Sequence, residues 1–236
     1  MVAIGNFFFK HRNWLFIVFY AALFLPSPAL FPAQLDPVSI ALGLTVTVLG
    51  QLVRGFTIGL AYIVRGGKEG KPYAEGLVTE GIFRHCRNPL YVGNILMLLG
   101  VGILANSLYY VAIMIPLFLF IYQAIVLAEE DFLRKKFGPG FDQYCRDVNR
   151  WWPRISGLSH TLYSMEFNWK RWILKEHTTQ FIWLVGIAGL LLLNHPNLTA
   201  NNPACRQAWL IGSLASLSAL YILIRILKKS GRFSEA

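Results

Sequence analysis

The sequence predicts an all-α protein, a polytopic bundle of about six transmembrane helices. Hydrophobic residues make up 55% of the 236 residues, and the mean hydropathy is +0.47. Such a composition is typical of integral membrane proteins. Lys and Arg outnumber Asp and Glu by 22 to 12. The basic residues are gathered in particular loops, so we expect them to report membrane topology and expect no nucleic-acid partner.

A helix that crosses the hydrocarbon core needs roughly 20 apolar residues. We expect such helices over residues 14–30, 38–63, 89–105, 108–127, 178–193 and 208–227. The first run follows Lys10 and Arg12 and is also compatible with a signal peptide. The third run is short and rich in glycine, which fits one half of a helical hairpin.

Basic residues lie before the first run, between the second and third, between the fourth and fifth, and after the sixth. The alternate loops, residues 26–37 and 194–207, contain Arg206 as their one basic residue. Cytoplasmic loops of membrane proteins are enriched in Lys and Arg. We therefore expect both termini, and any site on the basic side, to face the cytoplasm.

The basic loops contain further predicted elements. Residues 66–72 are rich in glycine and include a proline, which predicts a flexible loop. Apolar residues at helical spacing predict a helix through residues 131–137, ended by Gly138, and a second short helix over residues 141–148. Aromatic residues interleaved with basic ones predict an interfacial helix over residues 163–172.

Two polar clusters flank the third and fourth runs. Arg84-His85-Cys86-Arg87-Asn88-Pro89 leads into the third run, and Glu129-Glu130 ends the fourth. Because the two runs cross the membrane and return, both clusters belong on one side. Pro89 suits the first turn of a helix, whose free N–H groups then face the loop. The basic residues are equally compatible with simple interfacial anchors.

The three cysteines, Cys86, Cys145 and Cys205, lie in different loops. No CxxC spacing is present, so neither a disulfide framework nor a metal site is indicated.

One group of motifs is similar to a known family. The group consists of Leu77-Val78-Thr79-Glu80-Gly81, Arg87-Asn88-Pro89-Leu90-Tyr91-Val92-Gly93, Glu129-Glu130, Leu133, Phe137-Gly138, Tyr144, Arg150 and Pro153. It resembles the integral-membrane methyltransferases, which include isoprenylcysteine carboxyl methyltransferase and the phospholipid N-methyltransferases. The resemblance implies that S-adenosylmethionine binds in a cytoplasm-facing pocket. It also implies a lipid or lipid-modified acceptor that enters from the bilayer.

The same resemblance implies roles for individual residues. The residues expected at the cofactor are Asn88, Pro89, Tyr91, Gly93, Glu129, Glu130 and Tyr144, and those expected at the reaction are Arg87, Glu130 and Arg150. Asn88 stands where the family has histidine. An amide cannot accept a proton near neutral pH, so no histidine base is supported here.

Two charged positions carry more specific expectations. Adjacent glutamates point to different faces of a helix, and Glu130 lies nearer the apolar face, so we expect Glu130 to matter more for cofactor binding than Glu129. Arg54 lies inside the second run, where a charge costs ~2.5–3.5 kcal/mol on insertion scales. We expect Arg54 to face the bundle and hold the acceptor's anionic headgroup, although a guanidinium that snorkels to the interface is also compatible.

We divide the chain into N-terminal helices (residues 1–71), a methyltransferase core (72–154), and an interfacial helix with two additional spans (155–236). These last two spans look like an appendage. Two other functions stay open from the sequence. One is an NADPH-dependent membrane reductase of sterols or other lipids, and the other is a non-catalytic lipid-binding membrane protein.

Overall fold

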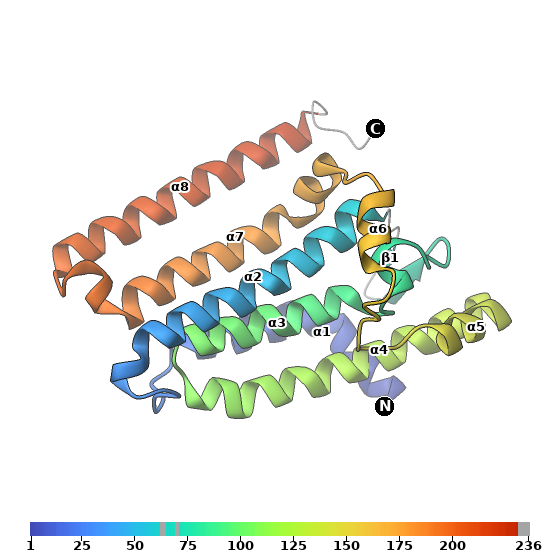
Figure 1. Cartoon of the computed structure of the whole chain (residues 1–236), viewed down its shortest axis with the longest axis horizontal. Coiled ribbons are helices and arrows are strands. Elements are labelled where there is room, and N and C mark those ends of the chain that lie inside the picture. Colours follow the sequence, from blue (N-terminus) through green and yellow to red (C-terminus); the bar gives the residue numbers. More distant parts are fainter. Residues whose placement is uncertain (62–64, 69–70, 231–236) are drawn as a thin grey trace.

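Six long helices lie beside one another in the computed structural model, which describes residues 1–61, 65–68 and 71–230 (Figure 1). They are α1 (Val2–Ala21), α2 (Asp36–Leu60), α3 (Pro89–Leu104), α4 (Ile115–Phe137), α7 (Trp169–Asn194) and α8 (Pro203–Lys229). The predicted all-α membrane bundle is confirmed.

Short elements connect the long helices. They are η1 (Ala22–Phe24), η2 (Ala33–Leu35), η3 (Gly81–Arg84), the π-helical turn η4 (Tyr110–Met114), α5 (Pro139–Asp147), α6 (Leu158–Ser164) and η5 (Pro196–Thr199). Gly138 adopts a φ of +53° between α4 and α5, as a helix-ending glycine does. The helix end predicted there is therefore present.

The segment predicted as a flexible loop contains two antiparallel strands, β1 (Arg65–Lys68) and β2 (Lys71–Ala74). Arg65 pairs with Ala74, and Lys68 pairs with Lys71. Composition alone did not reveal this pairing. Residues 69 and 70 lie outside the described residues.

Four described helical segments are long and apolar enough to span a membrane: Ala33–Leu60, Tyr110–Phe137, Trp169–Asn194 and Pro203–Lys229. Helix α3 is apolar but shorter, as expected for the third run. The first predicted run differs most, because α1 occupies residues 2–21 rather than 14–30. Prolines at positions 26 and 28 oppose helix continuation. The predicted end of the second run, Ile63, lies outside the described residues.

Helices α2 and α3 approach each other through glycines. A Cβ added to Gly50 would lie 2.6 Å from the Gly93 carbonyl oxygen, and one added to Gly43 would lie 2.6 Å from the Leu104 nitrogen. Small residues allow this close approach of helix backbones in membranes. The contact sets the position of α3 relative to the residues of α2.

Helix α7 is part of the bundle, whereas α8 lies outside it. Helix α7 packs against α2 and α3, and the Trp183 indole on α7 donates a 2.7 Å hydrogen bond to the Thr47 hydroxyl on α2. Helix α8 packs against α7 and contains no buried residue. The description of both C-terminal spans as an appendage is therefore wrong for α7, because its inner face contacts the core helices.

The predicted interfacial helix over residues 163–172 is also divided. Helix α6 ends at Ser164, and α7 begins at Trp169 after Asn168, whose side-chain oxygen accepts a 2.8 Å hydrogen bond from the Arg171 N–H. This N-cap starts a new helix. The basic residues of this segment therefore belong to the first turn of a long helix.

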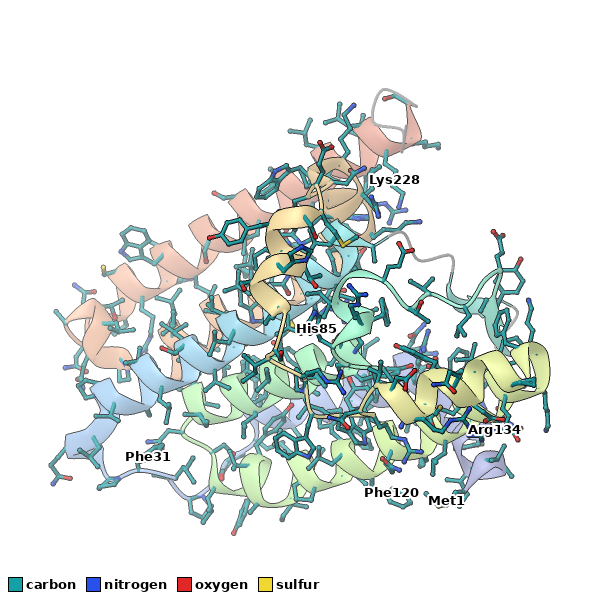
Figure 2. The ribbon with its side chains drawn as sticks, turned by 45° about the vertical axis from the view of Figure 1, so that its right-hand side comes forward. Met1, Phe31, His85, Phe120, Arg134 and Lys228 are labelled. Atoms are coloured by element: carbon teal, nitrogen blue, oxygen red, sulfur yellow. The ribbon has the colours of Figure 1, made fainter. Side chains whose placement is uncertain are left out.

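One end of the bundle contains the start of α1, the end of α8, β1, α5 and α6 (Figure 1). Figure 2 shows Met1, Arg134 and Lys228 toward this end and Phe31 at the opposite end. The strand β1 and the short helices α5 and α6 therefore lie at the end that contains the predicted site residues.

We expect Gly50→Ala to destabilise the protein, because the added methyl group meets the α3 backbone. Overpacking of this kind costs about 1–3 kcal/mol. Thermal unfolding in detergent measures the change. Gly212→Ala is the matched control, because Gly212 lies in exposed α8 with nothing within 4 Å of its added Cβ. Equal Tm values for the two variants would contradict the tight α2–α3 contact.

Candidate functional site

The α3–α4 hairpin brings the two predicted polar clusters together. The Tyr91 hydroxyl on α3 donates a 2.9 Å hydrogen bond to Oε1 of Glu129 on α4. The Asn88 side chain, immediately before α3, donates a 3.2 Å hydrogen bond to the Arg150 carbonyl in the loop after α5. Three segments that are distant in sequence therefore meet at one end of the bundle.

Glu130 binds two arginines. Its side chain accepts bidentate hydrogen bonds from Arg150, 3.0 Å from Nε to Oε1 and 2.7 Å from Nη2 to Oε2, and the Arg87 Nη1 lies 3.1 Å from Oε1. Glu130 is only 4% exposed. Hydrogen bonding to Glu130 raises the pKa of the Arg150 guanidinium above its usual value. This arrangement joins α4 to the segment before α3 and to the loop after α5.

The segment before α3 is further fixed by His85 and Phe83. The two ring nitrogens of His85 lie 2.7 Å from the Arg154 carbonyl and 2.8 Å from the Thr161 hydroxyl of α6 (Figure 2). The Tyr144 hydroxyl donates a 2.7 Å hydrogen bond to the Phe83 carbonyl. His85 therefore connects the segment before α3 to α6 and to the loop that precedes it.

A cavity of about 1000 Å³ lies between α1, α3, α4 and α7. This volume is at the upper end of ordinary ligand pockets. Most of the lining is apolar, and the polar or amphipathic lining residues are Arg12, Asn13, Tyr20, Arg54, Asn88, Tyr91, Asn94, Tyr122, Glu129, Thr178, Thr179 and Trp183. The cavity suits an amphipathic ligand.

Arg54 lies in the bundle interior, where the sequence analysis places it. Its guanidinium donates to both carboxylate oxygens of Glu176 on α7, 2.9 Å from Nε and 2.5 Å from Nη2, and Nη1 lies 2.5 Å from the Asn94 Oδ1 on α3. Glu176 is 2% exposed and Arg54 is 9% exposed. Sequence reasoning missed Glu176, although an acidic residue at the edge of an apolar run is a usable signal. A role of Arg54 in acceptor binding stays a prediction.

A small hollow adjoins the cavity, and Asn88 lines both. The other residues of the hollow are Gly76, Leu77, Val78, Arg87, Glu130, Leu133, Phe141 and Tyr144. The Nε atom of Arg87 is buried and has no hydrogen-bond partner among the described residues. The hollow therefore offers a polar group that a ligand can satisfy.

Three of the predicted residues differ in which of the two spaces they line. Glu129 lines the cavity, whereas Glu130 lines the hollow with its oxygens bound to two arginines, so Glu129 is the carboxylate better placed to meet a ligand. Gly93 lines neither space, because its Cβ position faces the Arg54 Cγ at 2.6 Å. The absence of a side chain at Gly93 allows α2 to approach α3 closely. Of the remaining predicted residues, Pro89 and Tyr91 line the cavity and Tyr144 lines the hollow.

We expect Glu130→Gln to lower the Tm more than Glu129→Gln does. Removing the Glu130 charge leaves Arg87 and Arg150 without their shared counter-ion, and breaking a buried pair costs roughly 3–5 kcal/mol. Arg150 is partly exposed, so a value below this range is expected. Thermal unfolding of both variants in the same detergent checks this. Indistinguishable Tm values would mean that the three-residue cluster does not stabilise the fold.

Comparison with known proteins gives one family match. Residues 38–140, from α2 into the start of α5, match the family described as phospholipid methyltransferase. This range contains the α3–α4 hairpin and Glu129-Glu130. The match confirms the resemblance to membrane methyltransferases that the motifs predict.

The chain is also similar to individual proteins. The chain is 29% identical over 79% of its length to the cobalt-zinc-cadmium resistance protein CzcN of Cupriavidus metallidurans, covering 82% of that protein. It is 33% identical over 49% of its length to the nickel-cobalt-cadmium resistance protein NccN of Alcaligenes xylosoxydans xylosoxydans, covering 48% of that protein. A probable protein-S-isoprenylcysteine O-methyltransferase of Oryza sativa subsp. indica is 29% identical over 48% of the chain, and 60% of that protein is covered. No solved structure gives a significant match.

Proposed function

We propose that this chain, which resembles the phospholipid methyltransferase family, transfers a methyl group from S-adenosylmethionine to a lipidic acceptor with a carboxylate or amine headgroup. The observation that carries the proposal is the meeting of the α3 and α4 motifs at one wall of the cavity. Tyr91 and Glu129 form that wall, and Asn88 joins it to the polar hollow. An apolar cavity with polar groups at one place suits a lipid that must meet a polar cofactor.

The residues present fit S-adenosylmethionine. Its sulfonium is a permanent cation, which the Glu129 carboxylate stabilises without a proton transfer, and the same carboxylate is a suitable acceptor for ribose hydroxyls. Further hydrogen-bond donors are the Asn88 amide, which lines both spaces, and the Arg87 Nε of the hollow, which has no partner among the described residues. When bound, this cofactor supplies the methyl group.

The chain's own contribution is positioning. Methyl transfer is an in-line displacement, so the wall must hold the donor and the nucleophile in a near-attack geometry. Tyr91 orients Glu129 through its hydrogen bond, and Arg54 fixes α2, α3 and α7 around the cavity. The apolar lining excludes water, which strengthens the electrostatic interactions inside.

We carry no metal-binding role over from the relatives named for metal resistance. The described cavity lining has one carboxylate, Glu129, and its other polar groups are arginines, amides, hydroxyls and an indole. Cobalt, zinc and cadmium prefer imidazole and thiolate ligands, with carboxylates next. The lining therefore suits an organic ligand better than these ions.

We expect the purified protein to bind S-adenosylhomocysteine, the demethylated product, in calorimetric titration. Glu129→Gln should weaken binding by about tenfold, because a charged hydrogen bond is worth roughly 1.5–3 kcal/mol. Glu166→Gln, at an exposed position outside the cavity, is the matched charge control. Binding of NADPH in place of S-adenosylhomocysteine would favour the reductase. Binding of neither would favour a non-catalytic lipid-binding protein.

A further inference from the structure

Arg12 lies inside the first helix and lines the cavity. Because α1 begins at Val2, Arg12 is near the middle of the helix rather than before it. Its guanidinium lies 4.3 Å from the centre of the Phe9 ring. Among the described residues no carboxylate pairs with it. Arg54, the other arginine of the cavity, is bound by Glu176.

The position of Arg12 follows from the packing of α1 on α4. Gly5 lies against Ala124, and the Phe16 ring is 5.2 Å from the Tyr122 ring, so α1 and α4 run antiparallel. Arg12 lies one turn before Phe16 on α1, and Arg12 and Tyr122 both line the cavity. Tyr122 precedes Glu129 by two helical turns, roughly 10 Å along α4. Arg12 and Glu129 therefore place opposite charges at different levels of one cavity.

We infer that Arg12 binds the headgroup of the acceptor, and that this headgroup is anionic. Arg12 lines a mostly apolar cavity without a carboxylate partner among the described residues, and an anionic ligand would neutralise its charge there. Its planar fork also matches a carboxylate or phosphate in a bidentate geometry. Glu129 then faces the cationic donor and Arg12 faces the anionic acceptor. The identity of this anion as the methyl acceptor rests on the proposed function.

The chemistry of the cavity agrees with an acceptor that needs no base. A carboxylate oxygen forms the new O–C bond while the C–S bond breaks and its electron pair stays on sulfur. The products are a methyl ester and a thioether, and no proton moves. An amine acceptor must first lose a proton. The described cavity lining contains no histidine, and its one carboxylate, Glu129, already accepts a hydrogen bond from Tyr91.

Binding of matched single-chain amphiphiles tests this inference. The full-length protein in neutral detergent is titrated with dodecanoate, dodecyl phosphate, methyl dodecanoate and dodecylamine, each below its own micelle concentration. We expect dodecanoate to bind at least about tenfold more tightly than methyl dodecanoate, which corresponds to ~1.4 kcal/mol. Arg12→Gln should remove this preference and leave the affinity for S-adenosylhomocysteine unchanged. Lys10→Gln, at an exposed position outside the cavity, is the matched control and should keep it.

A second variant covers the case in which Arg12→Gln does not fold. Asn13→Asp places a carboxylate beside Arg12 at the cavity with almost no change of shape, and it should also reduce the preference for dodecanoate. An unchanged preference in either folded variant, or tighter binding of dodecylamine, overturns the inference. A second assay distinguishes a carboxylate acceptor from a phosphate that is only bound: the carboxylate acceptor dodecanoate should be converted to its methyl ester. Loss of the anion preference in the Arg12 variant supports the inference whether or not the wild-type protein binds S-adenosylhomocysteine. Absence of S-adenosylhomocysteine binding to the wild-type protein would refute the proposed function alone.

Discussion

The buried ion pair between Arg54 and Glu176 is the interaction on which the rest of the bundle depends. It connects α2 to α7, and the hydrogen bond from Arg54 to Asn94 adds α3. Each charge would be costly alone in a membrane, and the bidentate geometry compensates part of that cost. The cavity lies against these three helices and against α1 and α4. A change in this pair would therefore move two walls of the candidate site at once.

The two adjacent glutamates of α4 have separate tasks because successive helical residues point about 100° apart. Glu130 points to Arg87 and Arg150 and holds the loops over the hollow. Glu129 points to Tyr91 and the cavity. One turn of α4 therefore contains both a residue that holds the structure of the site, Glu130, and a residue that faces the ligand cavity, Glu129. The same geometry explains why a motif of two identical residues does not imply two identical roles.

Hydropathy was sufficient to predict the helical bundle and the hairpin, because the apolar runs are long and the turn at residues 106–107 is short. Hydropathy placed the start of α1 incorrectly, because Arg12 interrupts the apolar pattern although the helix continues through this residue. The partner of Arg54 was missed: Glu176 stands out as an acidic residue at the edge of an apolar run, but it is 122 residues away and only the packing of α7 brings it close. The arginine partners of Glu130 were not predicted either, because they come from two other segments of the chain.

Helices α8 and α2 differ in what their side chains contact. No residue of α8 is buried, so its apolar side chains face the surroundings of the bundle, apart from those that contact α7, such as Tyr221 against Phe181. A side chain there has only to keep its hydropathy, and many sequences satisfy that condition. At Gly43 or Gly50 a single added carbon meets the backbone of α3. Random mutation would therefore leave α8 free to diverge among apolar residues, while α2 would retain glycine at these positions.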